Sequence, residues 1–366
     1  MYDLYIEHCT EKNLDPVKHS YYRHIFNTEF NLRFHRPNSD TCSKCDGFNN
    51  IIKNSDNAEK VNTAKVSQTV HHRKAEKARE SKQNDSNVNK ESTDTFVICF
   101  DLQQALPTPH ITTSKVFYLR QLWTYNFCIH NLVTGKSDMY VWDETIASRG
   151  SQEIGSCLIH YITNAVPQNV TKIIAYSDSC GGQNKNKNIA KLFMYLVKAT
   201  RIQEIHHKFL EPGHTFMEYD QDFGIIEKVK RKNPQVFVPE HWRQLIKSSC
   251  KKFTVHEMSK ENFFSFSNLN NIISDPKKDT EKRAIKWREI QYFFFTKESE
   301  RFCFFYKTSL DPEFPFNKCL CPGKAAGRPK LTLKDTFDQL NREFKNKRAE
   351  VEKFADSFGI RSSKIS

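Results

Sequence analysis

Short apolar runs and longer amphipathic stretches alternate through the middle of the chain. The run TFVICFD at 95–101 is apolar and β-branched and precedes a proline-containing loop, so it predicts a buried strand. The stretch 115–145 contains the turn signal VTGKSD, which predicts two longer strands joined as a hairpin. An amphipathic stretch at 153–166, closed by Pro167, predicts a helix.

Strands and helices continue to alternate after this first helix. Segments 172–178 and 206–214 predict strands, and segments 186–201 and 216–232 predict helices. The resulting order is β-β-β-α-β-α-β-α. This order predicts an α/β fold over residues 95–235, with a mixed five-stranded sheet and flanking helices.

The regions on either side of this core differ from it in composition. Residues 1–53 predict an aromatic, basic module with one or two short helices. Residues 54–94 are so polar that we expect an exposed helix that frays into a linker. Residues 236–318 predict an α+β extension with a helix and a hairpin, and residues 319–366 predict a basic loop and a charged helix. We therefore expect one large domain with appendages at both ends.

The chain is strongly basic. Its formal net charge of +13 and pI of about 9.1 make nucleic acid the leading partner and a membrane surface the lesser one. Its start does not resemble a signal peptide, and no apolar run approaches the roughly 20 residues that span a bilayer. Its eleven Cys are an odd number, which indicates reduced thiols rather than a disulfide framework. We expect an intracellular, reducing compartment, with the nucleus as our choice, and no membrane partner.

Carboxylates stand at the ends of the predicted elements. Asp101 closes the first strand, Asp178 closes the fourth, and Asp220 and Glu227 lie on the last helix. A two-metal site for phosphoryl transfer needs carboxylates from separate elements, and ligands of α/β sheets lie beyond the carboxyl ends of strands. These acids predict a site for Mg²⁺ or Mn²⁺, with Asp220 or Glu227 as third ligand and Asp222 as a solvated surface charge. Taken singly, each strand-end acid is equally well explained as a turn or helix-cap residue.

The motifs around these acids resemble those of known proteins. The order of elements and the place of each acid are similar to the ribonuclease-H fold of ribonuclease H, retroviral integrases and cut-and-paste transposases. YSDSCGGQNKN and EPGHTFMEYDQDFGIIEK resemble two signature blocks of a large family of transposon-derived proteins common in animal genomes. FDLQQALPTP resembles the family's first acidic block and HRPNSDTCSKCD its amino-terminal Cys motif, so the resemblance covers most of the chain.

The resemblance implies a DDE/DDD-type nuclease core that acts on DNA by phosphoryl transfer. It also implies a role for His214, because a His near the last carboxylate of ribonuclease H assists the departure of product. The alternative is a capping or packing residue, which is the commoner role of a lone loop His. Transposases often act as dimers or larger assemblies, so a homo-oligomer is a further expectation.

Basic residues near the acids predict contacts with phosphates. Two of these basic residues stand at the start of the predicted helix that follows the loop SCGGQ, and four lie in the KVKRK run after the acidic residues. A seventh lies in a Gly-Arg-Pro segment that resembles the centre of an AT-hook. They are Lys185, Lys187, Lys228, Lys230, Arg231, Lys232 and Arg328. A solvated charged face, or for Arg328 a plain loop, explains the same residues.

A C-x2-C knuckle, Cys42–Cys45, lies in the amino-terminal module. One knuckle is half of a structural zinc site and needs two more ligands. His71 or His72 on the following helix could complete it, with His72 as our choice and His35 or Cys9 as other candidates. Two free thiols are the alternative to a zinc site.

Two functions compete on these observations. The first is a transposase-derived, Mg²⁺-dependent nuclease or strand transferase that uses a DDD or DDE site. The second is a domesticated, catalytically inactive DNA-binding or scaffold protein. Converging carboxylates favour the first, whereas splayed carboxylates, or ones paired with a Lys of the KVKRK run, favour the second.

Overall fold

The computed structural model describes residues 2–30, 41–111, 121–215, 217–266, 269–297 and 302–321. The chain divides into two compact units, Met1–Ser43 and Lys44–Ser366. Arg328 and the charged helix predicted near the carboxyl end lie outside the described residues.

The first unit contains two short helices, α1 (Tyr2–Glu11) and α2 (His19–Thr28). They pack through aromatic rings, because the ring of Tyr22 lies 5.3 Å from that of Tyr2 and 5.0 Å from that of Tyr5. The Tyr2 hydroxyl also donates a hydrogen bond to the Val17 carbonyl at 2.7 Å. The two helices therefore form a small aromatic hairpin.

The second unit is built on a mixed sheet. Ten strands of the described residues belong to it, in the order β10-β9-β8-β6-β5-β1-β3-β4-β7, with β2 paired to β3. They are β1 (Thr95–Leu102), β2 (Leu106–Thr108), β3 (Leu122–Asn131), β4 (Ser137–Asp143), β5 (Lys172–Ser177), β6 (Glu204–Phe209), β7 (Phe253–Glu257), β8 (Tyr292–Thr296), β9 (Cys303–Lys307) and β10 (Asn317–Leu320). β1, β5 and β6 run parallel, while β3 runs antiparallel to β1 and β4.

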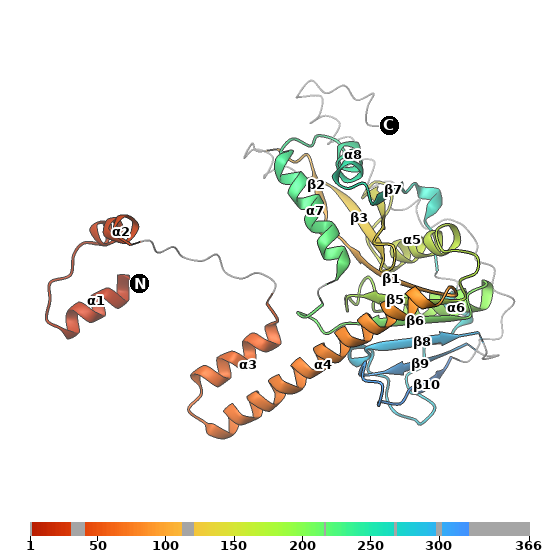
Figure 1. Cartoon of the computed structure of the whole chain (residues 1–366), viewed down its shortest axis with the longest axis horizontal. Helices are drawn as coiled ribbons and strands as arrows, with labels where there is room; N and C mark the ends of the chain where they lie inside the picture. The colour runs from red at the N-terminus through yellow and green to blue at the C-terminus, as the bar shows by residue number, and fades with distance from the viewer. Residues whose placement is uncertain are drawn as a thin grey trace. The chain divides into compact units, whose positions relative to one another are not determined.

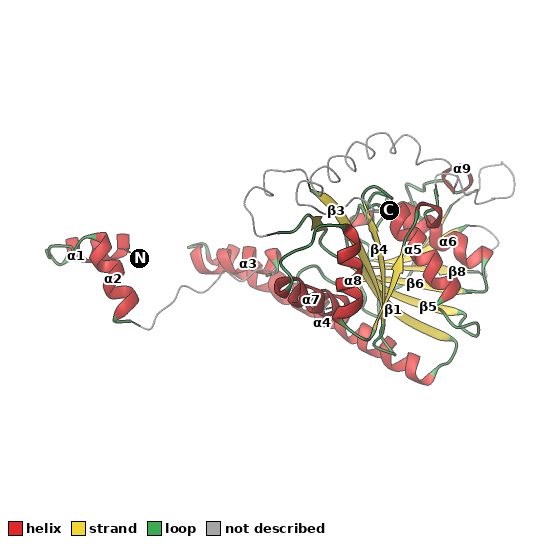
Figure 2. Ribbon diagram, turned by 90° about the horizontal axis from the view of Figure 1, so that it is seen from above, coloured by secondary structure: helices red, strands yellow, loops and turns green. Residues whose placement is uncertain are grey.

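Helices cover both faces of this sheet (Figures 1 and 2). Those of the second unit are α3 (Ser43–Asn54), α4 (Ala58–Glu91), α5 (Ser151–Asn164), α6 (Lys187–Ala199), α7 (Glu218–Lys232), α8 (Pro239–Ser249) and α9 (Leu269–Ile272). α5 and α6 pack on one face, and α4, α7 and α8 on the other. The α/β class predicted from the sequence is confirmed.

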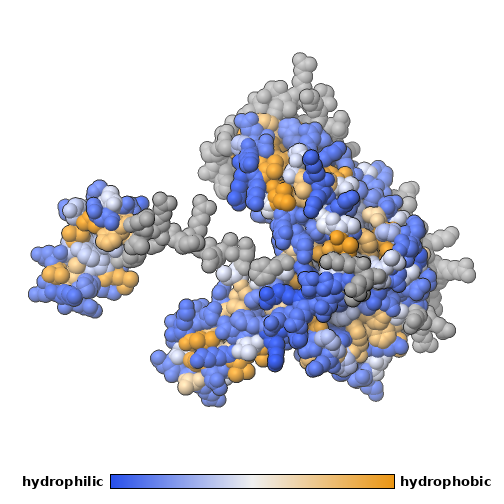
Figure 3. Space-filling view, in the orientation of Figure 1, coloured by the Kyte–Doolittle hydropathy of each residue, from blue (hydrophilic) through white to orange (hydrophobic). Residues whose placement is uncertain are grey.

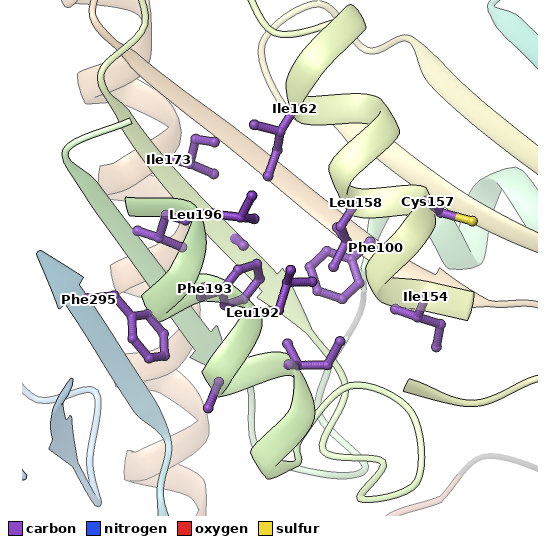
Figure 4. Close-up of a cluster of buried hydrophobic side chains, with 14 of the residues drawn as sticks. Phe100, Ile154, Cys157, Leu158, Ile162, Ile173, Leu192, Phe193, Leu196 and Phe295 are labelled. Atoms are coloured by element: carbon purple, nitrogen blue, oxygen red, sulfur yellow. The ribbon is translucent and has the colours of Figure 1, made fainter. Parts of the chain in front are cut away.

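Alternation along β1 sends side chains to both cores. Ile98 and Phe100 belong to the core under α5 and α6, whereas Val97 and Cys99 belong to the core under α4, α7 and α8. A strand that is buried on both faces reads as a continuous apolar run, which explains the TFVICF pattern. In the first core, Phe100 lies near Leu158 of α5 and Leu192 of α6 (Figure 4).

The sheet is wider than the five strands that the sequence predicts. β8 pairs antiparallel with β6, and its Phe293 and Phe295 are buried in the same core as α6. β7 pairs parallel with β4 at the other edge. The region after residue 236 therefore extends the central sheet, because its apolar strands cover edges that would otherwise be exposed.

Residues 58–91 form one long helix, α4, where the polar composition predicts a fraying linker. Its buried residues are Ala64, His71, Ala75 and Ala78, which lie on one face because they are spaced by seven, four and three positions. Alanine gives little hydropathy contrast, so this stripe is inconspicuous in the sequence. Ion pairs Lys82–Glu218 (2.9 Å) and Asp85–Lys208 (2.6 Å) hold the helix on the unit.

None of the described helices is long and apolar enough to cross a membrane.

Hydrophilic residues cover most of α4 in the view of Figure 3, and hydrophobic residues gather where α3 meets the start of α4. Ile51, Val66 and Val70 are exposed in this part of the helix pair.

His207 makes the stability of the second unit dependent on pH. It is fully buried on β6, and burial, with the nearby charge of Lys185, lowers its pKa to about 3. In the unfolded chain the pKa is about 6.5, so below pH 6.5 the unfolded chain binds a proton that the folded chain does not. We expect the free energy of unfolding to fall by about 1.4 kcal/mol per pH unit from this group as pH drops from about 6.5 toward 3.

Urea unfolding at pH 7.5 and pH 5.0 measures this dependence. His207→Gln keeps a polar side chain near Ser177, whose hydroxyl lies 2.8 Å from His207 Nε2. The wild type should lose about 2 kcal/mol more than this variant between the two pH values. Equal losses in both proteins would contradict the assignment.

Candidate active site and metal centre

Asp101 and Asp178 leave neighbouring strands at the same end of the sheet. β1 and β5 are parallel, and Phe100 is paired with Ser177, so the residue that follows each lies at the same edge. This edge is the carboxyl end of both strands, where ligands of α/β sheets bind. The structure therefore brings these two acids together.

Asn184 connects the two carboxylates. Its Nδ2 donates to Asp178 Oδ1 at 2.6 Å and to Asp101 Oδ1 at 3.1 Å. Its side-chain Oδ1 is buried and has no hydrogen-bond partner among the described residues. The sequence indicates Asn184 only as an amide near a helix start. Its role depends on the fold of the β5–α6 loop, which turns the side chain back toward Asp101.

Asp220 lies on the first turn of α7, and its Oδ2 accepts a hydrogen bond from the Met217 backbone at 3.1 Å. Its charge also acts on Asp101. Glu227 lies two turns further along α7, where it accepts from Gln103 (3.3 Å) and pairs with Lys230 (3.2 Å). The structure groups Asp220 with the strand-end acids and places Glu227 in a separate ion pair.

The pKa of Asp101 reflects the crowding of these acids. Burial is the largest cause that raises this pKa, and the charges of Asp178 and Asp220 raise it further. The pKa reaches about 7 although hydrogen bonds to the carboxylate favour its ionised form. Among the described residues, neither Asp101 nor Asp178 forms an ion pair with Lys or Arg. The site therefore holds negative charge that a cation would balance.

Asp222 anchors α7 against the sheet. We expected a solvated surface charge, and this is wrong, because Asp222 is buried. Its Oδ2 accepts from Ser137 Oγ at 2.6 Å and lies 2.7 Å from His130 Nδ1. Ser137 and His130 share one carboxylate oxygen inside the core, so this Ser-His-Asp set is a structural contact between α7 and strands β3 and β4. It fixes the helix that carries Asp220.

Asp222→Ala should lower the free energy of unfolding by about 3 kcal/mol, because it leaves two buried polar groups without their acceptor. Chemical denaturation measures this loss. The control is Glu80→Ala, which removes an exposed i,i+3 pair with Lys77 and should cost about 0.5 kcal/mol or less. An Asp222→Ala protein as stable as the control would show that the network contributes nothing.

A second group of side chains lies on α3, on α4 and in the loop after β6. Cys42, Cys45, His71 and His214 each offer one ligand atom, and these atoms lie within 4.8 Å of one another. Cys42 immediately precedes α3 and Cys45 lies on its first turn, so both thiols lie at the start of this helix. Two thiols and two imidazoles are a ligand set typical of zinc. The group could hold one metal ion.

His71 and His72 differ in their surroundings. His71 is buried and belongs to the metal-ligand group. His72, our choice from the sequence, is exposed, although its Nε2 also lies 3.3 Å from Cys45 Sγ. His214, which the resemblance places beside the last carboxylate, lies with its Nε2 3.3 Å from the same sulfur. The structure therefore brings His214 to the thiols.

Glu211 orients His71. Its Oε1 lies 3.3 Å from His71 Nδ1, and it also accepts from Lys44 (2.9 Å) and Gln291 (2.6 Å). A carboxylate on one ring nitrogen of a metal-binding His leaves the other nitrogen facing the ion. Burial lowers the pKa of both His71 and His214, which favours the neutral imidazole that binds metals.

The basic residues predicted from the sequence, apart from Arg328, which lies outside the described residues, fall into two places. Lys185 is half-buried, and Lys187 pairs with Asp275 at 3.4 Å. The others lie near the end of α7, where Lys230 pairs with Glu227 and Lys228, Arg231 and Lys232 are exposed. Among the described residues, no contact joins Lys185 or Lys187 to the basic residues of α7.

Residues 128–309 match the model of a domain described as a Domain of unknown function (DUF7869). The matched segment begins within β3 and ends just after β9, so it contains Asp178, Asp220 and His214 and excludes Asp101. No curated protein and no solved structure matches the chain. The match therefore covers most strands of the sheet, and its description names no activity.

Proposed function

We propose that the chain is a transposase-derived nuclease with a ribonuclease-H-like core, and that Asp101, Asp178 and Asp220 hold its catalytic metal ions. The observation that carries the proposal is the convergence of these acids at the carboxyl end of β1 and β5, where one amide nitrogen of Asn184 reaches two of them. The element order along residues 95–232 and the mixed sheet add support.

The residues present fit a hard divalent cation. The donors are carboxylate oxygens, which suit Mg²⁺ or Mn²⁺. Burial, together with the charges of Asp178 and Asp220, raises the pKa of Asp101 to about 7, and Asn184 carries a buried oxygen without a partner among the described residues. When bound, such ions activate water and stabilise the leaving oxygen of a phosphodiester.

The chain's own contribution is positioning. Asp101 and Asp178 stand on the rigid ends of two paired strands, and Asn184 fixes the orientation of both carboxylates. Asp220 is held by its hydrogen bond to the Met217 backbone on a helix that Asp222 anchors. Carboxylates held in this way need little rearrangement when they bind a cation.

DNA is the substrate that we propose, and the nucleus is the corresponding location. The net charge of +13 supports a polyanionic substrate. The exposed residues Lys228, Arg231 and Lys232 on α7 provide charge on the helix that carries Asp220. Assembly into a homo-oligomer is part of the same proposal and rests on the resemblance to transposases.

We also propose that Cys42, Cys45, His71 and His214 bind a structural Zn²⁺. Four protein ligands leave no open position, which is typical of structural rather than catalytic zinc. Such an ion would join α3, α4 and the loop between β6 and α7. That loop leads directly to Asp220, so zinc would support the catalytic acids through the backbone.

The second candidate is a catalytically inactive DNA-binding protein. One observation favours it, because Asn184 and the Met217 backbone already provide hydrogen bonds to all three acids. Cleavage of labelled DNA, measured with and without added Mg²⁺ for the wild type and for Asp178→Ala, separates the two candidates. Metal-dependent cleavage that Asp178→Ala lacks supports the nuclease, whereas binding without cleavage by both proteins supports the second candidate.

A further inference from the structure

A pocket lies next to Asp178, at the carboxyl end of β5. Its volume is about 360 Å³, and Ser179, the residue after Asp178, lines it. Four basic residues also line it: Lys44 from α3, Lys74 from α4, Lys185 from the β5–α6 loop, and Arg288. Side chains that are far apart in the sequence therefore meet around one cavity.

The carboxylates of this pocket already have partners. Glu211 is buried and accepts hydrogen bonds from Lys44 (2.9 Å) and Gln291 (2.6 Å). Glu289 pairs with Lys286 at 3.1 Å, outside the lining. Little negative charge therefore remains to balance the other basic residues.

The remaining cations lack such partners. Within the part of the chain that the structure describes, Lys74, Lys185 and Arg288 form no ion pair. Lys185 Nζ donates to the Arg288 carbonyl at 2.9 Å and lies 5.0 Å from the centre of the Phe209 ring. Burial lowers the pKa of Lys185 to about 8, because the charge of Glu211 offsets the loss of water only in part. An anion in the pocket would restore that balance.

We propose that this pocket binds a phosphate group of a nucleic-acid strand. Lys and Arg are the usual partners of phosphate oxygens, and the Ser179 hydroxyl adds a neutral donor. The volume exceeds the need of a bare phosphate and lies near the lower end for small ligands, about 300 to 1,000 Å³, so a sugar also fits. The position of Ser179 next to Asp178 places this phosphate next to the one that the acids would cleave, a step that rests on the proposed function.

Lys185→Gln is the variant that tests the pocket, and Lys187→Gln is its matched control. Both remove one positive charge from the same short segment. The sequence pattern predicted Lys187 as a phosphate contact, but in the structure it pairs with Asp275 and does not line the pocket, so we do not assign it to this binding site. Lys44 and Glu211 are avoided because they adjoin the Cys/His group. Lys74→Gln, on the exposed side of α4, is a second variant that leaves the packing around Phe209 intact.

The full-length chain is titrated against a short 3′-labelled single-stranded oligodeoxynucleotide in buffer without Mg²⁺ or Mn²⁺ and without a chelator, and binding is followed by fluorescence anisotropy. Lys185→Gln should weaken binding about tenfold, and Lys74→Gln should weaken it in the same direction. Inorganic phosphate should compete with the strand on the wild type more effectively than on Lys185→Gln. Lys187→Gln should bind within about twofold of wild type.

Two oligonucleotides, one with a 5′-phosphate and one with a 5′-hydroxyl, show whether the phosphate bound in the pocket is terminal or internal. Tighter binding of the first, lost in Lys185→Gln, assigns the pocket to a terminal phosphate, and equal binding assigns it to an internal phosphodiester. Equal losses in Lys185→Gln and Lys187→Gln, or no loss in either pocket variant, would overturn the proposal. Because the assay contains no Mg²⁺ or Mn²⁺, binding of this kind by a chain that never cleaves DNA contradicts only the proposed nuclease activity.

Discussion

Asp178→Asn should lower Mg²⁺-dependent cleavage by roughly 1,000-fold or more, equivalent to about 4 kcal/mol of transition-state stabilisation. The substitution keeps the shape of the side chain and removes the charge that would hold a cation beside Asp101. Asn184 can still donate to the remaining oxygen, so we expect the fold to survive. Single-turnover cleavage of labelled DNA measures the rate, and thermal unfolding checks the fold.

The same assay decides the third acid. Asp220 shares the site with Asp101, whereas Glu227 is paired with Lys230, so Asp220→Asn should lose activity comparably and Glu227→Gln should retain most of it. The reverse result would assign the third ligand to Glu227. Glu80→Gln, exposed on α4, is the control for charge removal far from the acids. A wild-type rate in Asp178→Asn would exclude this site.

Removal of zinc should have the second largest effect. If zinc is present at about 1,000 times its dissociation constant, binding stabilises the folded chain by about 4 kcal/mol. For a unit of about 300 residues, with an unfolding entropy of roughly 2 cal/mol/K per residue, such a change corresponds to a fall in Tm of roughly 6 to 7 °C after chelation. Metal analysis of the purified chain should find one zinc ion, and calorimetry with and without a chelator measures the shift.

Neighbouring histidines provide a matched pair for this prediction. His71→Ala should lose the bound zinc and the thermal stability with it, whereas His72→Ala, one position along α4 and exposed, should keep both. Loss of zinc in His72→Ala alone would show that His72 is the ligand. A wild-type chain without zinc, with a Tm that a chelator does not change, would leave Cys42 and Cys45 as free thiols.

The local pattern of the sequence was sufficient for the elements of the core. The apolar run before Asp101, the hairpin that follows it and the alternation up to residue 232 all appear in the structure as expected. Each of these elements has either a continuous apolar face or a turn motif at its end. Its own residues are therefore enough to predict it. The two strand-end acids could be selected for the same reason, since the end of an apolar run marks the end of a strand.

Long-range contacts decided the rest. Asn184 reaches Asp101 only because a loop closes, Asp222 is buried only because Ser137 and His130 lie opposite it, and His214 meets Cys45 across 169 positions of sequence. The width of the sheet likewise depends on β7, β8, β9 and β10, which all come from the carboxy-terminal part of the described chain. Periodicity reports which face of an element is apolar, but the partner of a polar side chain is set by tertiary packing, which leaves no local signal in the sequence.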